Sequence, residues 1–274
     1  MTINLAPRPN NEEHRAKAVI KTGLIDAPKP EVFQVYCDLA KEITAFKTAT
    51  FSLYDGEIQC AISATGKEDF EVGNKSDRDQ YNICSYVLLD VEPLIMEDIW
   101  AEPSWRTHPK VKDGTGSRGY AGFPVINRDN YALGTLCMTN PEPMQISNEK
   151  ISLIKKITQN MAHLLDVQAD QKEVTSQKIL EALTNFQKED DSFSLEDFKI
   201  FLAINSHIKT DKKSAHRLLK NQLCKIGDQR DLILTPKGQR LKDKMNLEAK
   251  PMKRIKLNGG AADDLIDEMF ANLK

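Results

Sequence analysis

The chain has 274 residues, enough for one large domain or two of ordinary size, and we start from two. Apolar residues make up 40% and charged residues 28%, which excludes collagen-like, mucin-like and wholly disordered chains. No stretch approaches the roughly 18–20 consecutive apolar residues that cross a bilayer, and residues 1–14 contain no apolar signal-peptide core. We therefore expect a cytoplasmic protein with no membrane partner.

The formal net charge of −2 conceals a strong asymmetry along the chain. Residues 207–256 contain 15 lysines and arginines against five aspartates and glutamates, a net charge of +10, so the remaining residues sum to −12. Such a segment indicates an anionic partner, nucleic acid first. A solvated helical surface that faces an acidic partner explains the charge equally well.

Residues 30–45 predict a core-facing helix behind Pro30, because apolar side chains recur at helical spacing: Val32, Phe33, Tyr36, Leu39, Ala40 and Ile43. Strands are predicted at 48–54 and 57–64, since both segments are rich in β-branched and aromatic residues around the turn dipeptide Asp55-Gly56. We then expect a loop over 66–79, a short helix within 80–89 and a strand at 93–99.

Residues 100–118 combine prolines, glycines and charges, and predict a long irregular connection with one helical turn at most. The runs at 119–127 and 131–140, joined by residues 128–130, predict a second hairpin. Ser147 is a suitable N-cap for a helix that continues to about residue 188, far beyond the usual length of about 10–14 residues. We interpret it as a connecting or dimerising helix.

A second domain is expected after the break at residues 189–191. Ser194 and Asp197 predict a capping box for a helix over 195–205, followed by a short helix at 212–223 and a strand at 230–235. Thr235-Pro236 predicts the start of another helix. The expected divisions are an N-terminal extension, a first domain, a connecting helix, a small basic domain and a flexible tail, at 1–21, 22–166, 167–190, 191–247 and 248–274.

Residues 22–166 resemble a GAF domain of the stand-alone sensory type. The matching stretches follow in family order: TGLIDAP at 22–28, Cys84 before the third strand, PLIMEDIWAEPSWRTHPKV at 93–111, GYAGFPV at 119–125 and ALGTLCMTNPEP at 132–143. The resemblance implies an antiparallel sheet flanked by helices, with a small-molecule pocket on the irregular side. Two departures argue against a bilin chromophore: Ser85-Tyr86 stands where Ala-His often follows the cysteine, and no Pro-x-Ser-Asp-Ile-Pro-like segment occurs. Residues 58–61 also lack the bulky aromatic that the family usually carries after the hairpin, which is compatible with a filled pocket. The identity of the ligand is not implied.

Pocket candidates are polar or aromatic residues and glycines that let a ligand approach the backbone, together with two cysteines: Cys84, Asp98, Trp105, Tyr120, Gly122, Thr135 and Cys137. The alternative is that Trp105 and Tyr120 close the core while Asp98 caps the loop. The five cysteines are odd in number and never C-x-x-C, which favours reduced thiols. No histidine pattern or enzymatic signature is present, so we expect no metal, no cofactor and no enzymatic output domain.

The basic segment is similar to winged-helix and phage-antirepressor-like modules, in which a strand runs into a Thr-Pro-Lys-Gly helix start. That resemblance implies groove contacts by Lys213, Arg217 and Lys220. It also implies phosphate contacts by Lys209, Lys225, Arg230 and Lys237. A helical module with a basic surface for a protein partner is the alternative.

The leading hypothesis is a homodimeric sensor whose ligand-dependent state passes along the long helix to the basic module and regulates transcription. One alternative is a dimerisation or scaffold protein whose pocket is filled. Another is a thiol-dependent reductase, as in one enzymatic branch of the GAF family, which requires Cys84 and Cys137 within disulfide reach, with Cα atoms less than about 7 Å apart. The apolar run after Cys84, without a nearby base, favours an inert buried thiol over that role.

Overall fold

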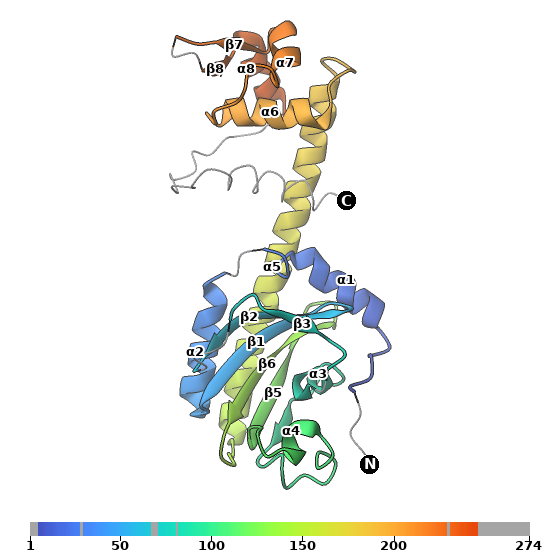
Figure 1. Ribbon diagram of the computed structural model, residues 1–274, viewed down its shortest axis with the longest axis vertical. Coiled ribbons are helices and arrows are strands. Elements are labelled where there is room, and N and C mark those ends of the chain that lie inside the picture. The colour runs from blue at the N-terminus through green and yellow to red at the C-terminus, as the bar shows by residue number, and fades with distance from the viewer. Residues whose placement is uncertain (1–4, 28–29, 67–70, 81, 229–230, 246–274) are drawn as a thin grey trace. The chain divides into compact units, whose positions relative to one another are not determined.

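The computed structural model describes residues 5–27, 30–66, 71–80, 82–228 and 231–245 (Figure 1). The chain divides into two compact units, residues 1–172 and 173–274. Helix α5 (Asn148–Gln187) contributes residues to both of them. The predicted tail at 248–274 lies outside the described residues.

The first unit is built on a six-stranded antiparallel sheet in the order β3-β2-β1-β6-β5-β4. The strands are β1 (Thr48–Tyr54), β2 (Ile58–Thr65), β3 (Lys75–Asp77), β4 (Leu94–Met96), β5 (Gly119–Ile126) and β6 (Ala132–Asn140). Asp55 closes the first hairpin, since its carboxylate accepts hydrogen bonds from the backbone N–H groups of Glu57 and Ile58. The predicted antiparallel sheet with flanking helices is therefore confirmed.

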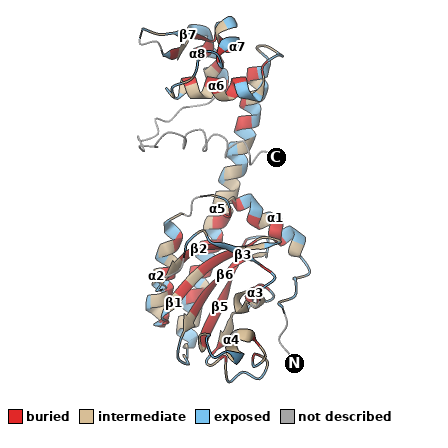
Figure 2. Cartoon of the chain, in the orientation of Figure 1, coloured by how far each residue is buried: buried red, intermediate tan, exposed pale blue. Residues whose placement is uncertain are grey.

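Four further helices belong to this unit: α1 (Glu12–Thr22), α2 (Val32–Thr44), α3 (Ile83–Val87) and α4 (Pro109–Lys112). One face of the sheet packs against α2 and the first part of α5, so that Phe51 of β1, Phe33 and Ile154 share one core. Figure 2 shows the central strands as a continuous buried layer. On the opposite face a smaller cluster joins α3 to the loop around Trp105.

The sequence expectations for this unit need three corrections. The buried side of α2 consists of Phe33, Cys37, Ala40 and Thr44, a stripe that leaves Val32 and Leu39 43% and 40% exposed. Residues 66–79, expected to be a loop, contain strand β3, which pairs with β2. Residues 12–22, given no element from the sequence, form α1, which packs on the sheet through Val19.

The second unit gathers short elements around the end of α5. They are α6 (Leu195–Asn205), α7 (His216–Lys220), β7 (Cys224–Ile226), β8 (Leu232–Leu234) and α8 (Pro236–Lys244), with β7 and β8 paired as a hairpin. Phe186 of α5 stacks on Phe193 with ring centroids 4.7 Å apart and also contacts Phe198 and Phe201. This aromatic cluster is the centre of the second core.

Local capping signals set the helix starts of the second unit. The capping box between Ser194 and Asp197 is formed, and the Thr235 hydroxyl accepts the N–H of Gly238 at 3.1 Å, so both predicted starts are confirmed. The helix expected over 212–223 is wrong in length, because regular helix covers only His216–Lys220 and turns flank it. Strand β7 was not predicted.

Candidate functional site

A cavity of about 890 Å³ lies on the face of the first-unit sheet opposite α2. Strands β1, β2, β3, β5 and β6 form its floor, while α3 and the segment around α4 form its walls. Its lining residues are Thr48, Thr50, Ser52, Gln59, Ser76, Asp79, Gln80, Asn82, Ile83, Cys84, Ile99, His108, Pro109, Val111, Gly116, Ser117, Tyr120, Cys137 and Thr139.

Hydroxyl side chains cover much of the floor. Thr48, Thr50 and Ser52 occupy alternate positions of β1, so the register that buries Phe51 in the main core turns these hydroxyls toward the cavity. The Thr48 hydroxyl lies 2.6 Å from the hydroxyl of Thr139 on β6. The floor therefore offers groups that both donate and accept hydrogen bonds.

Asn82 fixes the wall helix α3 against the sheet. Its side-chain oxygen accepts the backbone N–H of Cys84 at 2.9 Å, which caps the helix, and its amide nitrogen donates to Gln59 of β2. Gln59 in turn donates to Ser52 at 3.3 Å. This chain of side-chain hydrogen bonds places the Cys84 thiol at the cavity wall.

Two thiols and a tyrosine meet where α3 approaches β5 and β6. The Cys137 sulfur lies 3.1 Å from the Tyr120 hydroxyl and donates to Thr135 at 3.2 Å. Cys84 packs against the same small cluster of buried residues. Burial raises the pKa of Cys137 well above its ordinary value, and the neighbouring Cys84 raises it further. Cys137 is therefore protonated at neutral pH.

Tyr120 is a further uncharged group of the cavity lining, and Tyr54 is buried outside that lining. Burial raises the pKa of Tyr120 well above its usual value, with Cys137 and Cys84 adding to the effect. Burial likewise raises the pKa of Tyr54, which Thr135 and Asn82 partly offset. Both phenols keep their protons at neutral pH and act as hydrogen-bonding groups without charge.

Charged groups are scarce around the cavity. Asp79 is the one carboxylate among the described lining residues, and it forms an ion pair with Arg8 at 2.7 Å. No lysine or arginine occurs in the described lining. The site therefore lacks the cations that hold phosphates and carboxylates in most anion sites.

The structure brings three of the seven expected pocket residues together at the cavity: Cys84, Tyr120 and Cys137. The other four lie outside its lining. Asp98 pairs with Arg118 and caps the turn at Trp100, as in the alternative interpretation.

The remaining three support the cavity wall from behind. Trp105 packs edge-on against Tyr86, with ring centroids 5.1 Å apart. The Thr135 hydroxyl accepts a hydrogen bond from the Cys137 thiol. A Cβ atom on Gly122 would lie 2.5 Å from the Tyr120 hydroxyl, so glycine permits that tyrosine's position. Ligand contact by these residues stays a prediction.

Sequence reasoning missed the hydroxyl floor and the link between Asn82 and Gln59. Alternation along residues 48–54 was visible, but it does not reveal which face of the strand meets a cavity. Asn82 two residues before Cys84 is a recognisable capping signal that could have located the start of α3.

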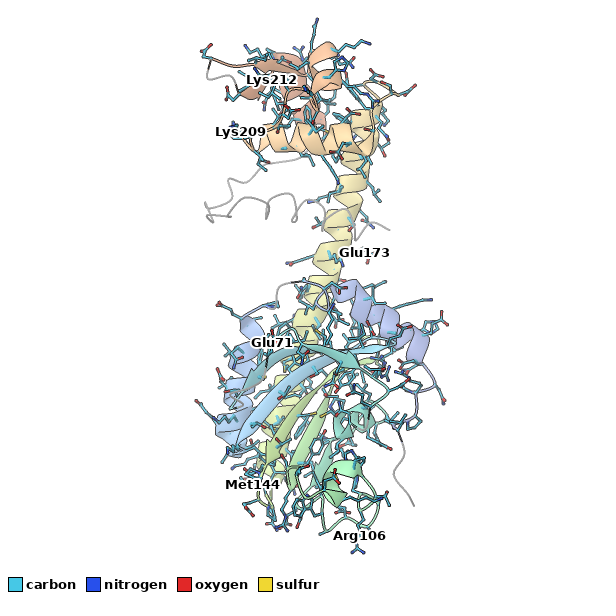
Figure 3. All side chains as sticks on the ribbon, in the orientation of Figure 1. Glu71, Arg106, Met144, Glu173, Lys209 and Lys212 are labelled. Atoms are coloured by element: carbon cyan, nitrogen blue, oxygen red, sulfur yellow. The ribbon has the colours of Figure 1, made fainter. Side chains whose placement is uncertain are left out.

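The basic side chains of the second unit differ in whether they are exposed to a partner or already bound to other groups of the chain. Lys209, Lys213, Lys220 and Lys225 are exposed, and Figure 3 shows Lys209 and Lys212 on this unit. Arg217 is tied by a 2.8 Å ion pair to Asp197 and by a 3.1 Å hydrogen bond to the Ser192 carbonyl oxygen.

Two other candidates of the basic set are placed differently. Lys237 is exposed, but its ammonium donates to the Asn221 carbonyl oxygen at 3.2 Å. Arg230 lies outside the described residues. The exposed lysines around α7 are therefore the better candidates for an anionic partner.

Comparison with known proteins identifies the family of the first unit. Residues 30–165 match the GAF domain family, so this part of the chain is a GAF domain. GAF domains are typically sensory and signalling domains, and most are regulatory rather than catalytic. No helix of the described residues is both long and apolar enough to span a membrane.

A curated relative is a cyclic di-GMP phosphodiesterase from Pseudomonas aeruginosa, 27% identical over 137 residues. The match covers 50% of this chain but only 22% of the relative, so the chain spans about a fifth of that protein's length.

Among solved structures, the GAF domain of an Acinetobacter phosphoenolpyruvate-protein phosphotransferase is 12% identical, with a TM-score of 0.41 over 56% of this chain and 93% of that one. A type II free methionine-R-sulfoxide reductase from Thermoplasma acidophilum is 15% identical, with a TM-score of 0.40 over 53% and 94%.

Proposed function

We propose that the first unit is a small-molecule sensor whose ligand binds in the 890 Å³ cavity between the sheet and α3. The cavity itself carries the proposal, because its volume lies within the range of about 300–1,000 Å³ that is typical of ligand sites. A cavity of this size also argues against the alternative of a scaffold protein with a filled pocket.

The sensor proposal can be tested by measuring how a panel of metabolites shifts the thermal unfolding of the full chain. Thr50→Trp fills the cavity floor, while Lys47→Trp places the same side chain at an exposed position beside β1. A ligand at 100 times its Kd stabilises by about 2.7 kcal/mol, a clearly measurable shift. We expect compounds that stabilise the wild type and Lys47→Trp to have no effect on Thr50→Trp. Equal shifts for both variants would place the ligand elsewhere.

We further propose that the second unit binds DNA and that the protein regulates transcription. The support is the net charge of +10 over residues 207–256 and the exposed lysines of the second unit, including Lys209, Lys213 and Lys225. Helix α5 supplies Ile154 and Leu165 to the first core and Ile179 and Phe186 to the second. A ligand that favours one arrangement of α5 would thereby bias the basic unit.

A homodimer is part of this proposal. Leu153, Val167 and Val174 are exposed on α5 at separations of 14 and seven residues, so they occupy equivalent heptad positions, with Asn160 at the intervening one. An exposed apolar stripe with this period is typical of a helix that pairs with a second copy.

A second candidate function is a thiol-dependent reductase, favoured by the two thiols, Cys84 and Cys137, that both line the cavity. Turnover of free methionine sulfoxide with dithiothreitol as reductant tests it. Loss of turnover in both Cys84→Ser and Cys137→Ser is the expected result for this candidate, and no turnover by the wild type would reject it.

A further inference from the structure

We propose that the acidic segment at residues 261–274 docks in a groove of the second unit of the same chain and covers exposed lysines there. The docking involves that unit alone and does not depend on a ligand in the first unit. Only its consequence for DNA, given below, rests on the DNA-binding function proposed above.

The groove has a volume of about 560 Å³ and lies where α7, the β7–β8 hairpin and the start of α8 meet (Figure 1). Leu219, Ile226 and Pro236 line it with apolar side chains, and Ile226 is 51% exposed. A concave surface that exposes apolar side chains gains free energy when the apolar side chains of a partner fill it. The groove therefore favours a partner that is apolar on one side.

The charges at the groove are positive. Lys225 of β7 and Lys237 of α8 both line it and are exposed, and no aspartate or glutamate occurs among its described lining residues. Lys220, which follows the lining residue Leu219, is exposed as well. Complementary charge steers a partner to such a surface and fixes its register. The partner that fits carries acidic groups beside its apolar side.

The end of the chain has this pattern in its sequence. Residues 246–274 lie outside the described residues. On a helical projection at 100° per residue, an arc of about 140° contains five apolar residues: Leu265, Ile266, Met269, Phe270 and Leu273. The remaining part of the projection contains four acidic residues: Asp263, Asp264, Asp267 and Glu268. With Lys274 as the one cation of residues 257–274, the net charge of this stretch is −3.

The chain between the last described residue and the segment is long enough for docking in the same molecule. Helix α8 begins with Pro236 at the groove and has nine residues, which span about 14 Å at 1.5 Å per residue. Between Met245 and Asp263 lie 17 residues, and a random-coil linker of that length spans about 21–25 Å on average. The segment can therefore return to the groove, at an effective concentration on the order of millimolar.

Docking would lower the affinity of the second unit for an anionic partner. Lys225 and Lys237 belong to the set expected to contact phosphates, and the acidic segment would cover both. A segment that is docked nine-tenths of the time leaves about one molecule in ten open, which lowers the apparent affinity for DNA about tenfold. The segment would thus be an autoinhibitory element of the basic unit.

Carbodiimide coupling of the full chain tests the docking, because this reagent joins a carboxylate to a lysine amine only when the two are in contact. Cleavage after lysine and arginine releases residues 257–274 as one peptide, while a coupled lysine is no longer cleaved. We expect this peptide to be linked to residues 221–230 through Lys225 or to residues 231–240 through Lys237. In a mixture with ¹⁵N-labelled chains, the linked peptides should come from the same chain.

Two variants of the segment separate docking from chance contact. Phe270→Asp places a charge in the apolar arc and should abolish these links, whereas Ala271→Asp adds the same charge in the acidic arc and should retain them. Absence of links to Lys225 and Lys237 in the wild type, equal link yields for both variants, or links mainly between labelled and unlabelled chains would each overturn the docking.

DNA binding by the same variants tests the consequence separately. In fluorescence anisotropy at 50 mM salt, Phe270→Asp should bind duplex DNA about tenfold more tightly than the wild type and Ala271→Asp. Links that are lost in Phe270→Asp together with no DNA binding by any of these proteins would support the docking and contradict the DNA-binding function instead.

Discussion

Arg15 of α1 donates a 2.5 Å hydrogen bond from Nη1 to the carbonyl oxygen of Tyr54 at the end of β1. The same guanidinium donates to the carbonyl oxygen of Asp55 at 2.8 Å and to the Glu12 carboxylate at 2.8 Å. Arg15 is completely buried, and burial lowers its pKa to about 10, so the side chain remains charged at neutral pH. One buried cation thus connects α1 to the end of a hairpin 39 residues later in the chain.

Replacing Arg15 tests how much this connection stabilises the GAF domain. Arg15→Met should lower the free energy of unfolding by about 3–5 kcal/mol, because buried carbonyl oxygens and Glu12 lose their partner. The matched control is Lys17→Met, which removes the exposed ion pair with Glu13 and should cost less than about 1 kcal/mol. Both tryptophans, Trp100 and Trp105, lie in the first unit, so urea unfolding followed by tryptophan fluorescence measures this domain. Equal losses for both variants would contradict the account.

Gly122 tests the packing behind the cavity wall. An alanine Cβ there would lie 2.5 Å from the Tyr120 hydroxyl and 2.6 Å from Val87 of α3, so one of them must move. Gly122→Ala should destabilise the domain by about 1–3 kcal/mol, as overpacking in a core does. Gly56→Ala is the control, since its nearest neighbour would be 3.9 Å away. Similar urea midpoints for Gly122→Ala and the wild type would show that the wall is loosely packed.

The capping box of α6 predicts a loss of stability in acid. Burial raises the pKa of Asp197, but hydrogen bonds from Ser194 and the charge of Arg217 outweigh it, and the net pKa is lowered. A lowered folded-state pKa means that this contribution is present above the unfolded value of about 3.9 and is lost as pH falls through the folded-state pKa.

The stability of the second unit can be followed by amide hydrogen exchange over residues 195–245. The exchange is measured between pH 3 and 7 and corrected for intrinsic rates. Protection in the wild type should fall below about pH 4, and Asp197→Asn should remove that step. Ser194→Ala should cost about 1 kcal/mol at pH 7, since the N-cap hydrogen bond is lost. A pH profile of Asp197→Asn that matches the wild type would contradict this assignment.

The apolar stripe on α5 predicts a pairing surface. Val174→Glu places a charge on the stripe and should convert a dimer to a monomer in light scattering coupled to size exclusion. Thr175→Glu adds the same charge at an exposed position about 100° around the helix from Val174 and should leave the dimer intact. A wild type that is monomeric at all concentrations would reject the homodimer.

Local signals made much of the fold predictable. Asp55 accepts backbone N–H groups two and three residues away, and Ser194 and Thr235 each accept an N–H three residues ahead. The partners of each signal are neighbours in the sequence. The turn and the two helix starts could therefore be read before the structure was known.

Long-range partners set the features that sequence reasoning missed. The role of Arg15 depends on carbonyl oxygens of Tyr54 and Ala132, 39 and 117 residues away, and β3 exists because it pairs with β2. The hydroxyls of Thr48 and Thr50 become a cavity floor only because α2 and α5 cover the other face. Of the candidate site, aromatic and thiol residues were foreseeable, and the polar floor was not.

Fluorescence anisotropy of the full chain with a random duplex DNA, at 50 and 200 mM salt, tests the proposed regulator most directly. A unit that makes several phosphate contacts should lose about 10- to 1000-fold in affinity between these concentrations, because bound counterions are released. The double variant Lys212→Glu, Lys213→Glu should weaken binding at 50 mM salt, whereas Lys41→Glu in the GAF domain should not. Absence of binding by the wild type at 50 mM salt would contradict the DNA-binding role and make the basic unit a surface for a protein partner.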